Sequence, residues 1–186
     1  MGKVFELIAD EALKESTYSD ECAFCGAKDR PIYNVTGFAI ESEQFMFQDI
    51  PEELEEFELN GACTKCFKDG KIKLFSEEEL EPILEMYCDE PYEQLKKIRG
   101  TPTIPLFMQG MDWVSCCGVL CEFMGSPESY GESIALVETH KFWDKGPKVW
   151  KTFWLSEFTL EPESLDEVSI FQCHRCNQHW FIWQST

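Results

Sequence analysis

The chain has 186 residues, 44% of them hydrophobic and 14% aromatic, which is enough for a core of its own and too apolar for an intrinsically disordered protein. It carries 35 Asp and Glu against 16 Lys and Arg, a formal net charge of -19. This charge repels phosphate backbones and anionic lipid surfaces, so it argues against nucleic acid or a membrane as the main ligand. We expect one α+β domain over residues 1–186, with short β-hairpins, zinc-ribbon-like CxxC turns and a few short helices.

The ten cysteines are the main chemical feature of the sequence. No stretch approaches the roughly 18 consecutive apolar residues that span a bilayer, and the N-terminus lacks the apolar segment of a signal peptide. We therefore expect a cytoplasmic protein. Because thiols stay reduced there, paired cysteines favour metal binding over disulfides.

The N-terminal part of the chain predicts an extended or helical start and then a strand pair. Residues 3–16 fit a short amphipathic helix and an extended segment equally well. Cys22 and Cys25 form a CxxC turn. Residues 32–35 and 37–40 are β-like runs, which we expect to pair as a hairpin beside that turn.

An acidic segment separates this region from a second CxxC turn. Residues 41–59 contain eight acidic residues and no basic one. Cys63 and Cys66 follow and complete a first zinc-binding module over residues 15–75. The acidic residues that we expect to contact a partner are Glu52, Glu53, Glu55 and Glu56.

The middle of the chain, residues 76–100, predicts two short helices. Ser76 is a favourable helix N-cap, and the acidic residues after it suit the first turn of a helix. Pro91 is suited to begin a second helix, and Gly100 to end it. Residues 77–93 again contain eight acidic residues and no basic one, so the negative charge is concentrated in blocks.

Residues 101–186 predict a second zinc-binding part. Residues 127–140 can form a helix. Near the end of the chain, residues 169–173 and 179–183 look like strands on either side of a third CxxC turn, so we expect a hairpin there.

Two sets of four cysteines predict two structural zinc sites. Zinc prefers four ligands in a tetrahedron, and a CxxC turn directs two thiolates to one point. The first set is Cys22, Cys25, Cys63 and Cys66, with Gly26 and Gly70 allowing the turns.

For the second set we expect Cys117, Cys121, Cys173 and Cys176. Either Cys116 or Cys117 can accompany Cys121, and we favour Cys117 because Gly118 permits a tight turn and because two adjacent cysteines do not easily reach one metal. Cys88 and Cys116 then remain as ordinary thiols.

No pattern in the sequence predicts catalysis. The three histidines form no H-E-x-x-H motif, and there is no nucleophile elbow and no phosphate-binding glycine loop. His174 and His179 lie in or beside the third CxxC turn, where His179 is an alternative ligand or a hydrogen-bond partner of one. Paired carboxylates in acidic blocks are typical of a solvated surface. We therefore expect a protein that is not an enzyme.

Several motifs resemble the CbrC family of bacterial cysteine-rich proteins, which is associated with colicin tolerance. They lie over about residues 3–183 and comprise Thr101-Pro102, Gln109, Trp113, Cys117-Gly118, Cys121, Phe123, Gly125 and Phe171-Gln-Cys173-His-Arg-Cys176, together with Cys22, Cys25, Cys63, Cys66 and Gly70. The chain departs from the family at Cys116, where His is frequent, and at Met108, where we expect an aromatic residue. The resemblance implies bacteriocin tolerance and brings no catalytic residues.

Together with the acidic blocks, this resemblance predicts an immunity-type protein that binds a basic toxin, such as a nuclease. Acidic fields of this kind give fast, steered association with basic partners. The alternative is a zinc-ribbon accessory protein that binds nucleic acid or the transcription machinery, with the lysines and aromatic residues of 141–154 as its platform. A zinc hydrolase is a third alternative and requires a metal with an open coordination position.

Overall fold

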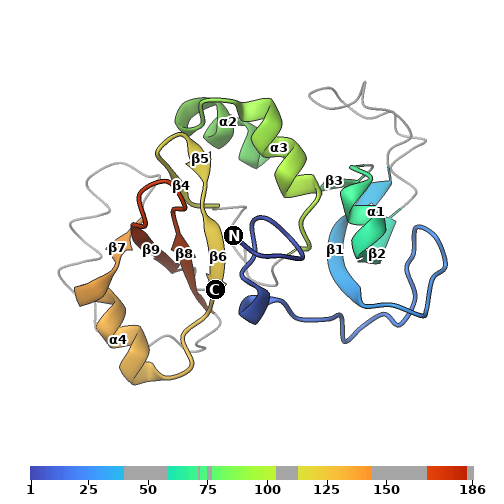
Figure 1. Ribbon diagram of the computed structural model, residues 1–186, viewed down its shortest axis with the longest axis horizontal. Helices are drawn as coiled ribbons and strands as arrows, with labels where there is room; N and C mark the ends of the chain where they lie inside the picture. The colour runs from blue at the N-terminus through green and yellow to red at the C-terminus, as the bar shows by residue number, and fades with distance from the viewer. Residues whose placement is uncertain (40–57, 71, 75–76, 104–112, 144–166, 184–186) are drawn as a thin grey trace.

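The computed structural model describes residues 1–39, 58–70, 72–74, 77–103, 113–143 and 167–183 (Figure 1). Short helices and small sheets alternate along these residues, so the fold is α+β, as the sequence predicted. The helices are the 3-10 turn Asp10–Ala12, α1 Thr64–Lys68, α2 Glu77–Tyr87, α3 Pro91–Arg99 and α4 Tyr130–Thr139. The strands are β1 Ile32–Ala39, β2 Glu58–Cys63, β3 Ile72–Leu74, β4 Ser115–Cys116, β5 Val119–Leu120, β6 Glu122–Gly125, β7 Lys141–Phe142, β8 Val168–Gln172 and β9 His179–Trp183.

The first sheet has the strand order β2-β1-β3 and is antiparallel. The hairpin predicted within residues 32–40 is wrong, because residues 32–39 form one continuous strand whose partners are β2 and β3. The register of the pairing with β2 shifts between Asn34 and Gly37, but the chain continues through this irregularity as one strand. A side chain at Gly37 would overlap the backbone of Lys73 in β3, so glycine permits this close approach.

The helices α2 and α3 form a layer above the two sheets (Figure 1). They begin and end close to the predicted positions, and their apolar faces are buried at Leu80, Leu84, Leu95 and Ile98. The predicted N-cap Ser76 lies outside the described residues. The side chain of Gln94 accepts a hydrogen bond from the backbone N–H of Leu120 at 3.1 Å, which attaches α3 to β5.

A buried ion pair joins the ends of this helical layer to the first sheet. Glu77 and Arg99 have side chains that are 0% exposed, and the guanidinium binds the carboxylate through two nitrogens at 2.8 and 2.6 Å. Glu77 also accepts a hydrogen bond from the backbone N–H of Leu74 in β3 at 2.8 Å. The two charges offset each other, which burial requires, although the other terminal nitrogen of Arg99 has no hydrogen-bond partner among the described residues.

The second half contains the sheet β6-β8-β9-β7 and the small ribbon β4-β5. The predicted C-terminal hairpin is confirmed, because β8 and β9 pair antiparallel with Gln172 opposite His179. The predicted helix within residues 127–140 is also confirmed as α4. Ser129 caps it by accepting a hydrogen bond from the backbone N–H of Glu132 at 3.3 Å.

The N-terminal segment lies between the two halves (Figure 1). It contains a turn in which the N–H of Ile8 donates to the carbonyl of Phe5, followed by the 3-10 turn Asp10–Ala12. Residues 3–16 therefore form neither an amphipathic α-helix nor a continuous extended segment. Leu7 and Ala9 exchange backbone hydrogen bonds with Phe123 in β6, and the Phe5 ring packs edge-on against Tyr33 and Phe67 of the first half. Buried side chains from both halves therefore form one continuous core cluster. Among the described residues, no helix is long and apolar enough to cross a membrane.

Candidate metal centres

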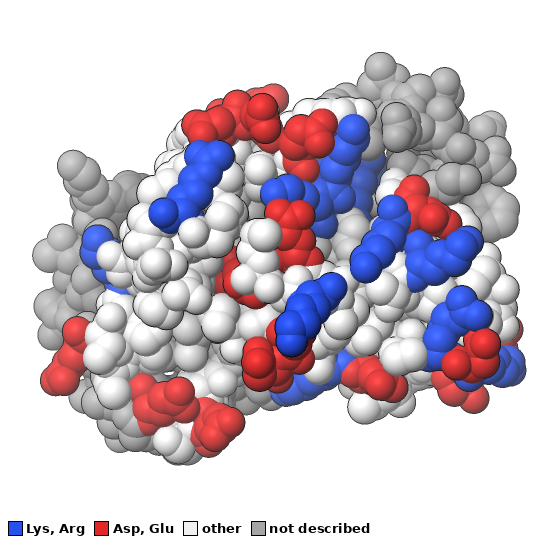
Figure 2. Space-filling model, in the orientation of Figure 1, with Lys and Arg blue, Asp and Glu red and all other residues white. Residues whose placement is uncertain are grey.

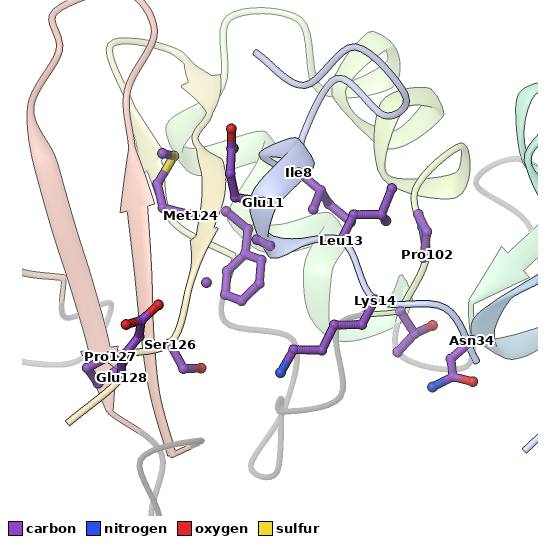
Figure 3. A pocket seen from close by; sticks show the side chains of 14 residues that line it. Ile8, Glu11, Leu13, Lys14, Asn34, Pro102, Met124, Ser126, Pro127 and Glu128 are labelled. Carbon is purple, nitrogen blue, oxygen red and sulfur yellow. The ribbon is translucent and has the colours of Figure 1, made fainter. Parts of the chain in front are cut away.

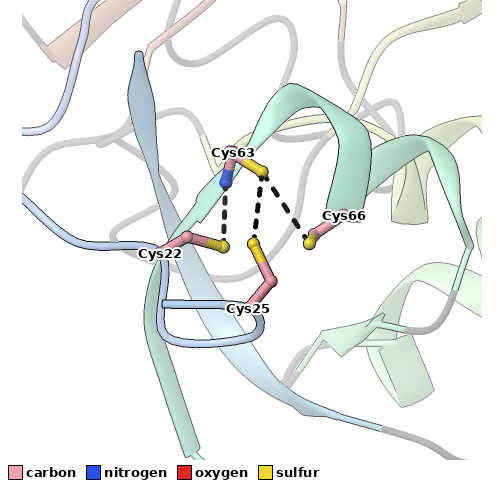
Figure 4. A group of neighbouring side chains, drawn as sticks. All are labelled: Cys22, Cys25, Cys63 and Cys66. Atoms are coloured by element: carbon pink, nitrogen blue, oxygen red, sulfur yellow. Dashed lines mark hydrogen bonds between the residues drawn. The ribbon is translucent and has the colours of Figure 1, made fainter. Parts of the chain in front are cut away.

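The first cysteine group consists of Cys22, Cys25, Cys63 and Cys66, as the sequence predicted. One pair lies in the turn before β1, and the other lies where β2 ends and α1 begins. The pairing of Ile32 with Cys63 brings the two turns together. Figure 4 shows the four sulfur atoms directed toward one another from these two segments.

The distances between these sulfur atoms match a tetrahedral metal site. The Cys25 and Cys63 sulfurs are 3.9 Å apart, those of Cys63 and Cys66 are 3.8 Å apart, and all four lie within 4.8 Å of one another. A zinc–sulfur bond of about 2.3 Å gives tetrahedral sulfur atoms a separation of about 3.8 Å. The backbone N–H of Cys63 also donates to the Cys22 sulfur at 3.3 Å, which stabilises a thiolate there.

The second cysteine group consists of Cys116, Cys117, Cys173 and Cys176. The sulfur of Cys116 lies 3.7 Å from that of Cys117 and 3.7 Å from that of Cys176. The four sulfurs again lie within 4.8 Å of one another, so this group has the same tetrahedral spacing. One pair comes from the β4-β5 ribbon and the other from the turn between β8 and β9.

The structure corrects the prediction for Cys121, because Cys116 occupies the place assigned to it. Adjacent residues in a regular strand direct their side chains to opposite faces, which would keep Cys116 and Cys117 from sharing a metal. Cys117, however, has a φ of 54° and Gly118 a φ of 75°, as in the two-residue turns that close β-hairpins. The left-handed backbone brings the Cys117 sulfur to the same side as that of Cys116.

Cys121 is fully buried beside the second group. Burial raises the pKa of its thiol, and the neighbouring cysteines, Cys173 first among them, raise it further. Cys88 is half-buried, and its sulfur lies 3.7 Å from the hydroxyl oxygen of Ser115. All ten cysteines lie in the described part of the chain, and all ten are free thiols.

The CxxC turns at Cys22 and Cys173 have the same hydrogen bonds. The N–H of the first cysteine donates to the carbonyl five residues later, that of Ala27 in one turn and of Gln178 in the other, at 2.9 Å in both. The N–H of the residue after the second cysteine donates back to the carbonyl of the first. That residue is left-handed in both turns, with a φ of 70° at Gly26 and 57° at Asn177. Two distant segments thus fold into one local structure.

The thiols of each group differ in how readily they ionise. Burial opposes ionisation of Cys22, but hydrogen bonds from the backbone, that of Cys63 foremost, outweigh it and lower its pKa from 9.0 to about 7. A hydrogen bond from the backbone of Gln178 is the main cause that lowers the pKa of Cys176 to about 7. Burial and then the neighbouring thiols raise the pKa of Cys66 and of Cys116. When all four thiols of a group ionise, a cation is required to offset their negative charge.

The histidines are outside both groups. His174 is exposed, and the His179 ring lies 5.1 Å from the ring of His140, centroid to centroid. No histidine or carboxylate of the described residues joins the four sulfurs of either group. The predicted partner-binding residues Glu52, Glu53, Glu55 and Glu56 lie outside the described residues.

A cavity of about 460 Å³ lies between the N-terminal segment, β1 and β6 (Figure 3). Its wall is apolar at Leu13 and Phe123 and charged at Glu11, Lys14 and Glu128. No cysteine or histidine of the described chain lines it, so it is separate from the two cysteine groups.

Comparisons with known proteins found no counterpart: no family model matches the chain, and no curated protein or solved structure gives a significant match. The fold and the two cysteine groups therefore define the chain only as an α+β protein with two four-thiol groups, each of which can hold a metal ion.

Proposed function

We propose that each cysteine group binds one zinc ion and that both ions are structural. The spacing of the sulfur atoms is the observation that supports this proposal most directly. Tetrahedral sites of four thiolates suit zinc, or iron bound by sulfur, and zinc is the usual metal of paired CxxC turns. When bound, the zinc ion supplies four bonds that link distant segments of the chain.

Four protein ligands complete a zinc tetrahedron and leave no position for water or a substrate. Such a site stabilises the fold and does not activate a nucleophile. We therefore propose a protein without catalytic activity, in which the metal ions replace part of the stability that a larger core would supply. Zinc of this kind contributes on the order of 10 kcal/mol to folding, as in zinc-finger peptides.

The role that we propose is to bind a basic protein partner through an acidic surface, as expected of a CbrC-like immunity protein. Two observations support it: the net charge of -19, and the sequence of α2, which contains five acidic residues and no basic one. Figure 2 shows acidic side chains at the end of the molecule formed by α2 and α3, with basic side chains beside them. Each four-thiolate zinc site adds about two further negative charges. A basic toxin would be drawn to this surface and blocked by it.

Co-expression tests the partner-binding role. Basic toxins encoded beside this gene should stop growth alone and permit it when this protein is present. Reversing the charge at Glu52, Glu53, Glu55 and Glu56 to Lys should abolish the rescue. The matched control reverses four acidic residues outside that segment, all of which are exposed in the structure, and should keep the rescue: Glu15, Asp20, Glu128 and Glu138. Equal rescue by both variants would contradict binding through the acidic segment.

A further inference from the structure

The two cysteine groups differ in how many sulfur-bearing residues solvent can reach. In the first group only Cys25 is exposed, and the other three cysteines belong to the hydrophobic core. In the second group Cys117 and Cys176 are both exposed, and Cys116 is half-buried. A small oxidant therefore reaches a pair of neighbouring thiols in the second group and a single thiol in the first.

A cation lies beside the exposed pair. The Arg175 guanidinium donates from one nitrogen to the carbonyl oxygen of Cys117 at 2.6 Å and to the carboxylate of Asp89 at 2.8 Å. Arg175, which is next to Cys176 in the chain, thus links the CxxC turn of Cys176 to the β4-β5 turn and to Asp89. Exposed thiolates beside a guanidinium are the environment in which cysteines are reactive.

The backbone of Cys117 adds a second difference. Its φ of 54° is a conformation that costs free energy in a residue other than glycine or asparagine. No cysteine of the first group has a positive φ. The second group is therefore held with more backbone strain.

We propose that Cys117 and Cys176 are a site of reversible oxidation by peroxides, and that their disulfide releases the metal of the second group while the first group keeps its own. This proposal rests on zinc being bound at the second group, as proposed above. It goes beyond that function because it makes one of the two zinc sites responsive to an oxidant.

The chemistry needs only hydrogen peroxide and two protons. One of the two exposed thiolates attacks one peroxide oxygen, breaks the O–O bond and becomes a sulfenic acid, with hydroxide as the leaving group. The other thiolate then attacks that sulfur, forms the S–S bond and expels a second hydroxide. The two thiolates lose two electrons, the peroxide gains them, and two protons from solvent convert both hydroxides to water. A metal ion held by this group would then have only two of its four ligands left.

Geometry favours this pair over the adjacent one. Consecutive Cα atoms are about 3.8 Å apart, which is below the range of about 4.4 to 6.8 Å found in disulfides. A Cys116–Cys117 disulfide would therefore be strained. Cys117 and Cys176 come from different segments, and their sulfurs already lie within 4.8 Å of each other.

The test begins with the metal content of the reduced protein. Elemental analysis should give two zinc ions per chain, and fewer than two would contradict the zinc proposal before any oxidant is added. Hydrogen peroxide is then added, with a colorimetric zinc chelator to follow release. We expect one zinc ion to leave on the order of tenfold faster than the other, and reductant with added zinc to restore two. Equal rates, or no release, would overturn the inference and leave the zinc proposal intact.

Mass spectrometry with fragmentation of the linked peptides identifies the oxidised pair. Trypsin cleaves after Arg175 and separates Cys173 from Cys176, whereas Cys116, Cys117 and Cys121 lie in one tryptic peptide, residues 100–141. Fragmentation of that peptide is therefore needed to show that Cys117 is the residue linked to Cys176. Any other disulfide as the main product would overturn the assignment. In Arg175→Gln we expect slower zinc release. The matched control is Arg30→Gln, which removes an arginine near the first group that already pairs with Asp29, and it should leave the rate unchanged. Equal rates in the two variants would overturn the role given to Arg175.

Discussion

The two cysteine groups contain the same four ligands and share a CxxC turn with the same hydrogen bonds, yet they are placed in different surroundings. The first lies at the junction of β1, β2 and α1, and three of its cysteines are in the core. The second joins the short β4-β5 ribbon to the turn between β8 and β9, and two of its cysteines are exposed. Two sites with the same four ligands can therefore contribute differently to the stability of the fold, because the burial of the ligands matters as well as their identity.

The largest effect should follow from loss of the first group. In Cys63→Ser the core loses a buried ligand and its metal, which costs on the order of 10 kcal/mol and is comparable to the whole stability of a typical domain. We expect an unfolded chain by circular dichroism. Cys117→Ser should lose one zinc ion but keep its secondary structure. A folded Cys63→Ser protein would remove the difference between the groups.

Substitution of Cys116 and of Cys121, one at a time, tests which of these two cysteines belongs to the second group. Cys116→Ala should bind one zinc ion per chain, because it removes a ligand. Cys121→Ala should bind two, because its sulfur is a neighbour of the group and not part of it. Native mass spectrometry counts the ions. The reverse result would restore the ligand set expected from the sequence.

The buried Glu77–Arg99 pair should affect the stability of the fold without affecting either cysteine group. Arg99→Met leaves a buried carboxylate without its partner, which should cost about 3 to 5 kcal/mol in the free energy of unfolding by urea. We expect the zinc content to stay at two, because the pair contacts neither group. The double variant Glu77→Gln, Arg99→Met should recover part of the loss. No recovery would mean that packing, and not the unpaired charge, causes the effect.

The smallest effect concerns the turn that brings Cys116 and Cys117 together. A side chain at Gly118 would overlap the Asp89 carboxylate in a left-handed backbone, so Gly118→Ala should cost about 2 to 3 kcal/mol and weaken zinc binding at the second group. Gly70 has a similar φ of 68° but open space around it. Gly70→Ala should therefore cost about 1 kcal/mol and spare both zinc ions. Competition with a chelator measures the zinc affinities.

The sequence predicted much of this structure because its signals were local. The CxxC turns, the helix that begins near Ser76, the proline that begins α3 and the C-terminal hairpin depend on neighbouring residues, and the structure contains each of these elements. The first cysteine group followed from two such turns. Local patterns were sufficient wherever a turn or a helix end involved residues close in sequence.

Two predictions failed because they depended on backbone conformation or on distant pairing. The segment expected to form a hairpin, residues 32–40, is one strand over residues 32–39, because β1 pairs with residues twenty or more positions away. Cys116 joins the second group because Cys117 adopts a left-handed backbone. This conformation is uncommon for cysteine, so the residue type at position 117 does not predict it. The following Gly118 was the available signal, since a two-residue turn of type I′ between short strands requires positive φ at both positions.

X-ray absorption at the zinc edge tests the central claim most directly. On protein that contains two zinc ions per chain, we expect a first shell of four sulfur atoms at about 2.3 Å, with no nitrogen or oxygen. A shell with an average of three sulfurs or fewer, or reduced protein that binds no zinc at all, would contradict two closed four-thiolate sites.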